Sequence, residues 1–428
     1  MLKAGIISLL NKLASVLAAF LCSVVIARSV GPEEFGKYTL CISVILMMTI
    51  VAQAGIPKFL TRETASNLFN KNWALLSGDM RLGGILAGFA GVLISGIAAA
   101  AITLLFSSDV QYNIFLYGIP LIIINSIGAV RAGVVRGLGK IGSGLFPEMV
   151  LRPVLTLLIM LLFVISVDIV SAEHAVIANV LASSISLVIG LVVLNLLLPS
   201  DAKAAVPTYQ VRRFKRALPI LVMVFLDEAN RQIGVIVLGL TATSFDVGIY
   251  KVAMQFSNLL LFGIAALDAS SSPYFSRIRE SGELNVLQRA AKFNSRVIWI
   301  VTAPAILMIV TLGPAFVTLI FGSEYQGAYA PLCILIIGPA ALVVAGSAST
   351  LLVMTGLEQD AARNLLLGSI LHVSLVLVLI PLWGNAGAAA ASSAALTFQA
   401  YLMWRSCALK LKVEPSIFPA RMERKDAA

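Results

Sequence analysis

Charged residues are scarce in this sequence: they fill 12% of its 428 positions, against roughly 25% in an ordinary soluble domain. Its four cysteines form no C-x-x-C pair and no pair in a predicted outer loop, so they indicate neither a metal site nor a disulfide framework. The sequence has only two histidines and no G-x-x-x-x-G-K-[ST] loop to bind nucleotide phosphates. The low charge excludes a soluble globular protein, and the other absences give no support to enzyme chemistry, ATP hydrolysis or a cofactor.

Apolar residues are abundant instead, at 59% of the chain with a mean hydropathy of +0.96. A helix needs about 20 apolar residues to cross a bilayer, and the sequence has twelve runs of that kind, bounded by turn residues and charges. They cover residues 6–27, 38–56, 82–106, 113–136, 149–167, 174–198, 218–241, 246–268, 294–321, 330–356, 364–383 and 386–407. We therefore predict an all-α polytopic membrane protein of about twelve transmembrane helices, whose short connections leave no room for a separate globular domain.

Lysine and arginine lie mostly at one side of these spans. If the N-terminus is cytoplasmic, 27 of the 31 basic residues lie on the cytoplasmic side or at its boundary, whereas Arg28 and Lys37 lie outside. Cytoplasmic loops of membrane proteins carry such an excess of positive charge. We expect both termini to be cytoplasmic and the first span to be an uncleaved helix, and the bias explains most of the net charge of +10 without nucleic acid.

Short internal matches indicate that the chain is a duplication. They are Gly36-Lys37-Tyr38 with Gly248-Ile249-Tyr250, Pro57-Lys58-Phe59 with Pro273-Tyr274-Phe275, and Gly137-Leu138 with Gly356-Leu357, at offsets of 212, 216 and 219 residues. Six spans per half give both halves the same topology, and transporters of this kind place the substrate between their halves. We predict two six-helix bundles, residues 1–205 and 206–408, related by an axis along the membrane normal, and a basic cytoplasmic tail, residues 409–428.

Ionisable residues inside the spans are candidates for function, because each costs about 2.5 to 3.5 kcal/mol to insert. Asp227, Glu228 and Arg231 lie within about one turn of span 218–241. They could neutralise one another so that the helix inserts, or one of them could pair with Lys251 in the next span. Alternatively, the second carboxylate, which one arginine leaves without a partner, binds H⁺ or Na⁺. Asp227 and Glu228 are our candidate ion-coupling residues.

Basic residues in the spans are candidates for binding an anion. Lys251 shares a polar stripe with Gln255 and Asn258, whereas Lys12 lies close enough to the cytoplasm to snorkel. One helical face of span 113–136 carries Asn125, Ala129, Ala132 and Arg136, of which we interpret Arg136 as a boundary residue, and Arg131 lies about one turn deeper. Because the repeat makes spans 1 and 7 and spans 2 and 8 equivalent, cations of both halves could converge on one cavity suited to a diphosphate. The predicted substrate-binding residues are Arg231, Lys251, Lys12 and Arg131.

Several motifs resemble those of a known family. Residues 27–38 read ARSVGPEEFGKY, and residues 55–63, directly after the second span, read GIPKFLTRE. Weaker matches are RGLGK at 136–140, VGIY at 247–250, FGSEY at 321–325 and Gly387 followed by an alanine run. Together they resemble the polysaccharide transporter family of bacterial flippases, within the multidrug, oligosaccharidyl-lipid and polysaccharide exporter (MOP) superfamily. The resemblance covers essentially the whole chain.

The resemblance implies two six-helix bundles that work by alternating access in the bacterial inner membrane. It also implies a substrate, an undecaprenyl-diphosphate-linked oligosaccharide such as an O-antigen repeat unit, which moves from the cytoplasmic to the outer leaflet. A cationic central cavity, coupling to H⁺ or Na⁺, contact with membrane lipid and partnership with other polysaccharide assembly proteins follow from the same resemblance. No covalent step and no cofactor are needed.

Two alternatives belong to other classes. A drug or small-molecule cation exporter of the same superfamily usually has an acidic, aromatic-lined cavity, whereas this chain offers cations as well as acids in its spans. A membrane-embedded polysaccharide polymerase or ligase is the enzyme alternative, and it would form new glycosidic bonds.

Overall fold

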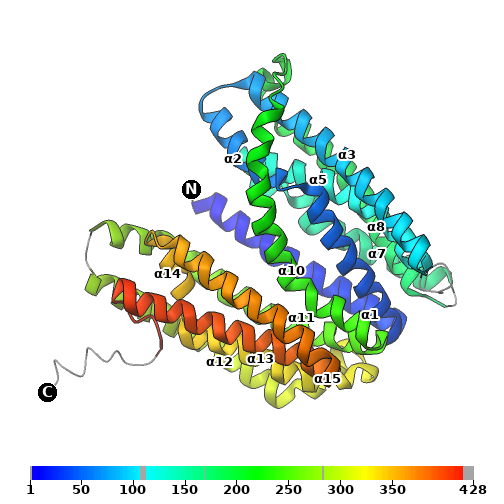
Figure 1. Cartoon of the computed structure of the whole chain (residues 1–428), viewed down its shortest axis with the longest axis vertical. Helices are drawn as coiled ribbons and strands as arrows, with labels where there is room; N and C mark the ends of the chain where they lie inside the picture. The colour runs from blue at the N-terminus through cyan, green and yellow to red at the C-terminus, as the bar shows by residue number, and fades with distance from the viewer. Residues whose placement is uncertain (1, 107–111, 168, 282–283, 418–428) are drawn as a thin grey trace. The chain divides into compact units, whose positions relative to one another are not determined.

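The computed structural model describes residues 2–106, 112–167, 169–281 and 284–417, and within these ranges the regular structure is helical and contains no strand (Figure 1). Contacts within the chain divide it into two compact units, residues 1–232 and 233–428. The predicted bundle limits near residues 205 and 408 stay a prediction. We describe each unit by itself.

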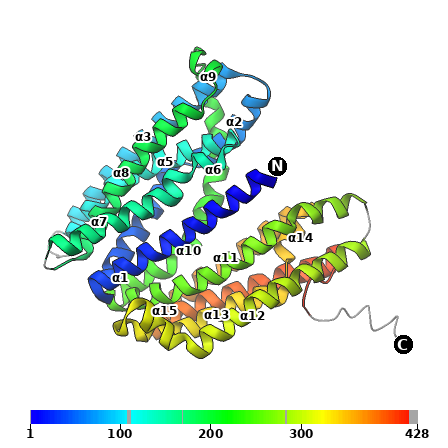
Figure 2. The same cartoon turned by 180° about the vertical axis from the view of Figure 1, so that it is seen from behind.

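The first unit contains α1 to α9 and the larger part of α10. Their bounds are α1 (Leu2–Gln53), α2 (Ile56–Phe69), α3 (Trp73–Phe106), α4 (Tyr112–Gly118), α5 (Pro120–Gly137), α6 (Ile141–Gly144), the π-helical turn η1 (Pro147–Leu151), α7 (Arg152–Ser166), α8 (Ala172–Leu197), α9 (Ser200–Ala204), the 3₁₀ turn η2 (Val211–Ala217) and α10 (Leu218–Thr241). Helix α5 packs against α1, α2, α3 and α8, and α7 runs beside α8 (Figure 2).

The second unit contains the end of α10 and the helices that follow. Their bounds are α11 (Ser244–Ser281), α12 (Leu284–Phe321), the 3₁₀ turn η3 (Ser323–Ala328), α13 (Tyr329–Ala345), α14 (Ala348–Met354), α15 (Glu358–Ser406) and the π-helical turn η4 (Cys407–Leu411). Helices α13 and α15 pack closely, with Gly338 of α13 facing Leu396 of α15. Helix α11 packs against α12 and α13.

The helices of the described residues cover all twelve predicted spans. By length and composition, nine of them can cross a membrane. Two of the nine, α1 and α15, each contain a glycine with non-helical backbone angles, Gly31 (φ 77°, ψ 171°) and Gly384 (φ 55°, ψ −128°), and each therefore supplies two spans. Helix α10 is not among the nine; three of its residues, Asp227, Glu228 and Arg231, are charged. The polytopic all-α architecture is thus confirmed.

The motif at residues 27–38 has a local physical explanation. Gly31 adopts a positive φ that disfavours other residues, and Pro32 follows it, so the chain turns sharply between the first two spans. Beyond this turn, Glu34 Oε2 accepts a hydrogen bond from the backbone N–H of Ala172, at the start of α8 (2.9 Å). Tyr38 Oη accepts one from Asn179 Nδ2 (3.0 Å). The motif therefore joins the first turn of the chain to α8.

Small residues let α5 approach α2 closely. A Cβ atom built on Gly133 would overlap the carbonyl oxygen of Pro57, and one on Gly137 would overlap Thr64. Thr61 Oγ1, which bonds to Pro57 O, also donates to Gly133 O (3.1 Å). Interfaces of this kind, with small residues in close contact, are typical of helix packing in membranes. By contrast, large apolar side chains such as Ile165 of α7 and Leu307 of α12 are exposed, as expected of lipid-facing surface.

We expect Gly133→Ala to lower the stability of the protein by about 1–3 kcal/mol, because the added methyl group overpacks a contact made by backbone. Gly84→Ala is the matched control, since a Cβ atom at Gly84 meets nothing within 4 Å. The thermal unfolding midpoint of each purified variant in detergent measures the difference. Equal midpoints for the two variants would contradict the close approach of α2 and α5.

Candidate functional site

Arg131 of α5 is a deeply buried charge of the first unit, with an exposed fraction of 2%. It makes four hydrogen bonds: Nη1 donates to the carbonyl oxygens of Gly144 (2.8 Å) and Gly190 (3.1 Å), Nε donates to Glu148 Oε1 (2.6 Å), and Nη2 donates to Glu148 Oε2. Helix α8 can come this close because residue 190 is glycine; a Cβ atom there would lie 2.8 Å from Arg131 Nε. Arg131 thereby joins α5, α6, η1 and α8.

Glu148 lies in the π-helical turn Pro147–Leu151, which directly precedes α7. Both of its carboxylate oxygens accept hydrogen bonds from Arg131, and its side chain is 25% exposed. Ser186 of α8 donates a hydrogen bond to the carbonyl oxygen of Pro147 in the same turn. Single π-helical turns often occur at functional sites, and this one ends at Leu151, directly before Arg152.

Arg152, the first residue of α7, is held by two neutral side chains. Its Nη1 donates to Asn125 Oδ1 of α5 (3.0 Å) and its Nη2 donates to Asn179 Oδ1 of α8 (3.2 Å). Asn179 in turn donates to Tyr38 Oη, and it accepts a hydrogen bond from Ser183 (3.2 Å). Because amide oxygens carry no net charge, these bonds orient the guanidinium without neutralising it.

These groups surround a cavity of about 270 Å³, which we call the N-terminal cavity. Its lining includes Gln53 of α1, Asn125 and Arg136 of α5, Glu148, Arg152 and Glu228, and all its residues belong to the first unit. The predicted face of α5 is confirmed, since Asn125, Ala129, Ala132 and Arg136 all line it. With Glu148 paired to Arg131, the remaining charges of the lining are Glu228 and the guanidinium groups of Arg136 and Arg152. Arg136, which the sequence suggested as a boundary residue, thus also lines the cavity.

The predicted charges of α10 lie near one another as expected. Arg231 Nη2 lies 3.3 Å from Asp227 Oδ2, and both side chains are mostly exposed, at 64% and 53%. Glu228 accepts a hydrogen bond from Gln232 (2.7 Å). Lys251 is a half-buried residue of α11 in the second unit. The backbone of Lys12 belongs to α1, but its side chain lies outside the part of the chain that the structure describes.

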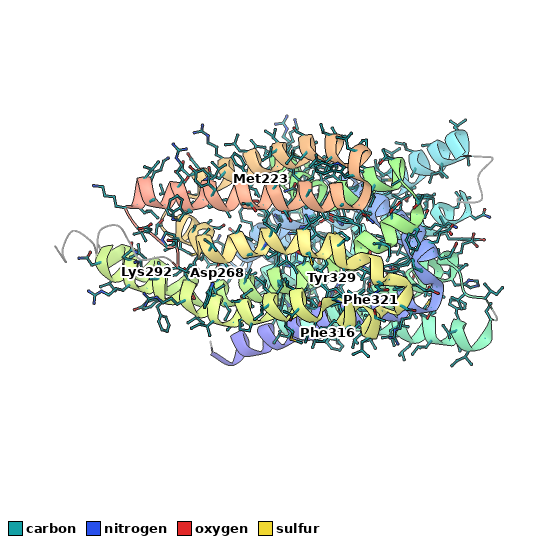
Figure 3. All side chains as sticks on the ribbon, turned by 90° about the horizontal axis from the view of Figure 1, so that it is seen from below. Met223, Asp268, Lys292, Phe316, Phe321 and Tyr329 are labelled. Carbon is teal, nitrogen blue, oxygen red and sulfur yellow. The ribbon has the colours of Figure 1, made fainter. Side chains whose placement is uncertain are left out.

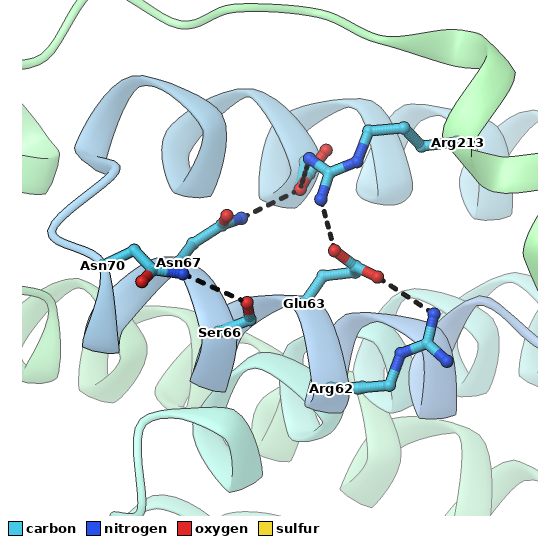
Figure 4. A network of polar contacts seen from close by, with 7 residues as sticks. Arg62, Glu63, Ser66, Asn67, Asn70 and Arg213 are labelled. Atoms are coloured by element: carbon cyan, nitrogen blue, oxygen red, sulfur yellow. Dashed lines mark hydrogen bonds and ion pairs between the residues drawn. The ribbon is translucent and has the colours of Figure 1, made fainter.

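A second polar network of the first unit joins η2 to α2 and α3. Arg213 of η2 donates to Asp79 Oδ2 of α3 (2.8 Å) and to Glu63 of α2, and Asn67 also donates to Asp79 Oδ2 (3.1 Å) (Figure 4). Beside it, the ring of Phe214 packs on Phe59, with centroids 5.0 Å apart. The backbone N–H of Thr208 bonds to Ala74 O (3.0 Å). The segment before α10 is thus fastened to α2 and α3.

Sequence reasoning missed Glu148, Arg152 and Arg213 as site or network residues. A signal for the first two was present: they are four residues apart, next to Pro147 and Pro153, at the start of an apolar span. Arg213 gave no such signal, because it lies among other basic residues of a loop whose charge was already explained by topology.

Comparison with known proteins agrees with this architecture. Residues 1–279 match the model of a family described as polysaccharide biosynthesis proteins. The chain belongs to this family. No curated protein sequence matches it.

Solved structures share the fold of this polysaccharide biosynthesis family member at low sequence identity. A multidrug resistance MATE family transporter of the MOP superfamily, solved inward-facing, is 15% identical with a TM-score of 0.78, covering 95% of this chain and 98% of its own. The lipid II flippase MurJ, solved in an inward closed conformation, is 12% identical with a TM-score of 0.66, covering 95% and 87%. A MOP superfamily transporter from Pyrococcus furiosus is 15% identical with a TM-score of 0.62, covering 94% and 96%. The fold is therefore that of MOP superfamily transporters.

We expect Glu148→Ala to destabilise the protein by about 3–5 kcal/mol, because it leaves the buried Arg131 charge without its partner. The double variant Arg131→Met, Glu148→Leu should be more stable than the single variant, since an apolar pair has no charge to desolvate. Asp227→Ala, which removes an exposed ion pair, should cost less than about 1 kcal/mol. The thermal unfolding midpoints of the purified variants in detergent measure these differences. A Glu148→Ala variant as stable as the parent would rule out the pairing of Arg131 with Glu148.

Proposed function

We propose that this protein is a flippase that moves undecaprenyl-diphosphate-linked oligosaccharide from the cytoplasmic to the outer leaflet by alternating access. The observation that carries the proposal is the pair of guanidinium groups, Arg136 and Arg152, in the lining of the N-terminal cavity. Of the two acids in this lining, Glu148 is paired with Arg131, and Glu228 accepts a hydrogen bond from Gln232. Two guanidinium groups suit a diphosphate, because each can donate two parallel hydrogen bonds to phosphate oxygens. Membership of a polysaccharide biosynthesis family and the fold shared with a lipid II flippase support the same substrate class.

Arg152 is prepared for this role by its neighbours. Asn125 and Asn179 accept one hydrogen bond from each of its terminal nitrogens, and each of these nitrogens carries a second N–H. Those remaining donors are available to phosphate oxygens once the substrate enters. Arg131, whose donors are engaged by Glu148 and two carbonyl groups, serves in this proposal to position the cavity wall and does not contact the substrate.

The polar sugars would pass through hydrated space while the polyprenyl tail remains in lipid, so the reaction needs no covalent step. Arg231 and Lys251 are proposed as further diphosphate ligands, each placed in a membrane helix. Glu228, which lines the N-terminal cavity, and Asp227 are proposed to couple flipping to H⁺ or Na⁺. We also propose that both termini lie in the cytoplasm of a bacterium, as the bias of basic residues toward one side of the spans predicts, and that other polysaccharide assembly proteins are partners.

A cation exporter is the second candidate, because the MATE transporter shares the fold at the highest of the three TM-scores quoted above. The charge of the N-terminal cavity disfavours it: with Glu148 engaged by Arg131, the positive charges of Arg136 and Arg152 outnumber the negative charge of Glu228, so an organic cation would be repelled. Pocket polarity does vary in this superfamily: the Pyrococcus furiosus transporter is described as having a reversed binding-pocket polarity that suggests a different function.

The test is a deletion of the gene in the native host, followed by complementation with variants present at equal membrane levels. We expect Arg152→Gln and Arg136→Gln each to reduce export of surface polysaccharide at least tenfold, because each removes a cation that binds the diphosphate. Lipid-linked repeat units should then accumulate on the cytoplasmic leaflet. Arg212→Gln, an exposed arginine of η2 that does not line the cavity, is the matched control and should export normally.

Other outcomes would identify the alternatives. Repeat units that reach the outer leaflet but stay unpolymerised, together with new glycosidic bonds made by the purified protein, would indicate a polymerase or ligase. Unchanged glycans with lost efflux of organic cations would indicate a drug exporter. Full export by both arginine variants would refute the assignment of the cavity.

The residues predicted on α10 and α11 are tested in the same host. Arg231→Gln and Lys251→Gln should each lower export several-fold if they hold the diphosphate, and normal export by both would remove them from the site. In proteoliposomes, Glu228→Gln should make flipping insensitive to an imposed H⁺ or Na⁺ gradient. An unchanged response to the gradient would place the coupling ion elsewhere.

A further inference from the structure

The seam between α11 and α12 in the second unit contains a cavity of mixed character that the proposed function does not use. It measures about 620 Å³ and is lined by Ser271 and Tyr274 of α11 and by Arg289, Phe293, Asn294 and Val297 of α12, among others. We call it the seam cavity. Tyr274 and Phe293 are 55% and 71% exposed, so it is flanked by aromatic side chains that reach the surface. Exposed aromatic residues of this kind are typical of the membrane interface.

The polar wall of the seam cavity is rigid. Asn294 Nδ2 donates to Asp268 Oδ1 (3.1 Å) and to Ser347 Oγ (2.6 Å), and Asn294 Oδ1 accepts from Ser271 Oγ (2.6 Å). These bonds fix the amide between α11 and the segment that follows α13. Because both amide hydrogens are engaged, the atoms that Asn294 and Ser271 can still offer to a ligand are oxygen lone pairs. The wall is therefore suited to accept hydrogen bonds from hydroxyl groups.

The charge of the lining has one sign. Arg289 is exposed and lies one turn before Phe293 on α12. Among the lining residues that the structure describes, none carries a carboxylate. The cavity is thus suited to a ligand with one negative charge and hydroxyl groups close to it.

An apolar stripe continues from this cavity along α12. Arg289, Phe293, Val297, Val301 and Ala305 follow one another at intervals of four residues, so each lies next to the following one, in a row that turns around the helix by about 40° at each step. Val301 is 56% exposed, and Ala305 lines a second cavity of about 310 Å³ whose walls are formed only by apolar residues, including Phe256, Met308 and Phe316. Figure 3 shows Asp268 and Lys292 toward one end of this unit and Phe316 toward the other. The seam thus has a charged end and an apolar continuation.

We propose that the α11–α12 seam binds an anionic phospholipid with a glycerol headgroup. Arg289 binds its phosphate, Asn294 and Ser271 accept hydrogen bonds from the headgroup hydroxyls, and one acyl chain follows Phe293, Val297 and Val301 toward the apolar cavity. A single arginine matches a lipid phosphate of one negative charge, whereas a diphosphate calls for more cations. The predicted topology places this end at the cytoplasmic leaflet, whose anionic lipids attract basic residues.

The test uses the full-length protein, purified and stripped of lipid in detergent, with phosphatidylglycerol, phosphatidylethanolamine and phosphatidylcholine as probes. We expect native mass spectrometry to show saturable binding of phosphatidylglycerol, weakened at least tenfold by Arg289→Gln and only about threefold by Phe293→Ala. Arg289→Lys should restore part of the binding because it keeps the charge. Arg212→Gln, in the first unit, is the matched control and should bind as the parent does.

Several results would overturn the proposal. Equal binding by the parent and Arg289→Gln would show that Arg289 does not hold the phosphate. Equal losses in Arg289→Gln and Arg212→Gln would indicate attraction by net charge alone. Equal affinity for phosphatidylethanolamine would contradict selection for an anionic lipid. Undecaprenyl diphosphate that binds in an Arg289-dependent way and displaces phosphatidylglycerol would assign the seam to that lipid instead. Because binding is measured without transport, the result is independent of the flippase proposal.

Discussion

The bonding of Arg131 is the interaction on which the functional part of the first unit depends. A guanidinium at 2% exposure in a membrane helix is costly unless its charge and its donors are matched. Here Glu148 supplies the charge, and the carbonyl groups of Gly144 and Gly190 accept the remaining hydrogen bonds. This requirement fixes three features at once: a glycine at residue 190, the close approach of α8, and the position of the turn that carries Glu148.

The electrostatics of the N-terminal cavity follow from that arrangement. If Glu148 were not engaged by Arg131, it would offset a positive charge of the lining, and Arg136 and Arg152 would present less net charge to a ligand. Because Glu148 is paired with Arg131, it lines the cavity without determining the sign of the cavity's charge. The two asparagines then hold Arg152 in place without neutralising its charge.

Much of the architecture was accessible from sequence, because spanning helices are defined by local runs of apolar residues. The twelve spans and the cavity face of α5 at Asn125, Ala129, Ala132 and Arg136 were found in this way. The contacts of Arg152 could not be found in this way, because its two partners lie 27 residues before it and 27 residues after it in the sequence. In addition, a basic residue at the end of a span is explained equally well by membrane topology. The charges of α10 were easy to notice, since they interrupt an apolar run, but local sequence does not say what a charge faces.

Arg131 and Arg152 differ in their hydrogen-bond partners, and this difference is the basis of the separate roles proposed for them. Pairing with Glu148 and two carbonyl groups lowers the cost of burying Arg131 and engages four of its five N–H donors, which leaves little capacity to bind a ligand. Arg152 keeps its full charge between neutral amides, which makes the empty cavity less stable than an ion-paired one would be. An arriving phosphate would relieve that cost, so part of its binding free energy would come from charge that the unoccupied protein leaves unbalanced. A cation held only by neutral amides is therefore a better ligand for an anion than a cation already paired with an acid.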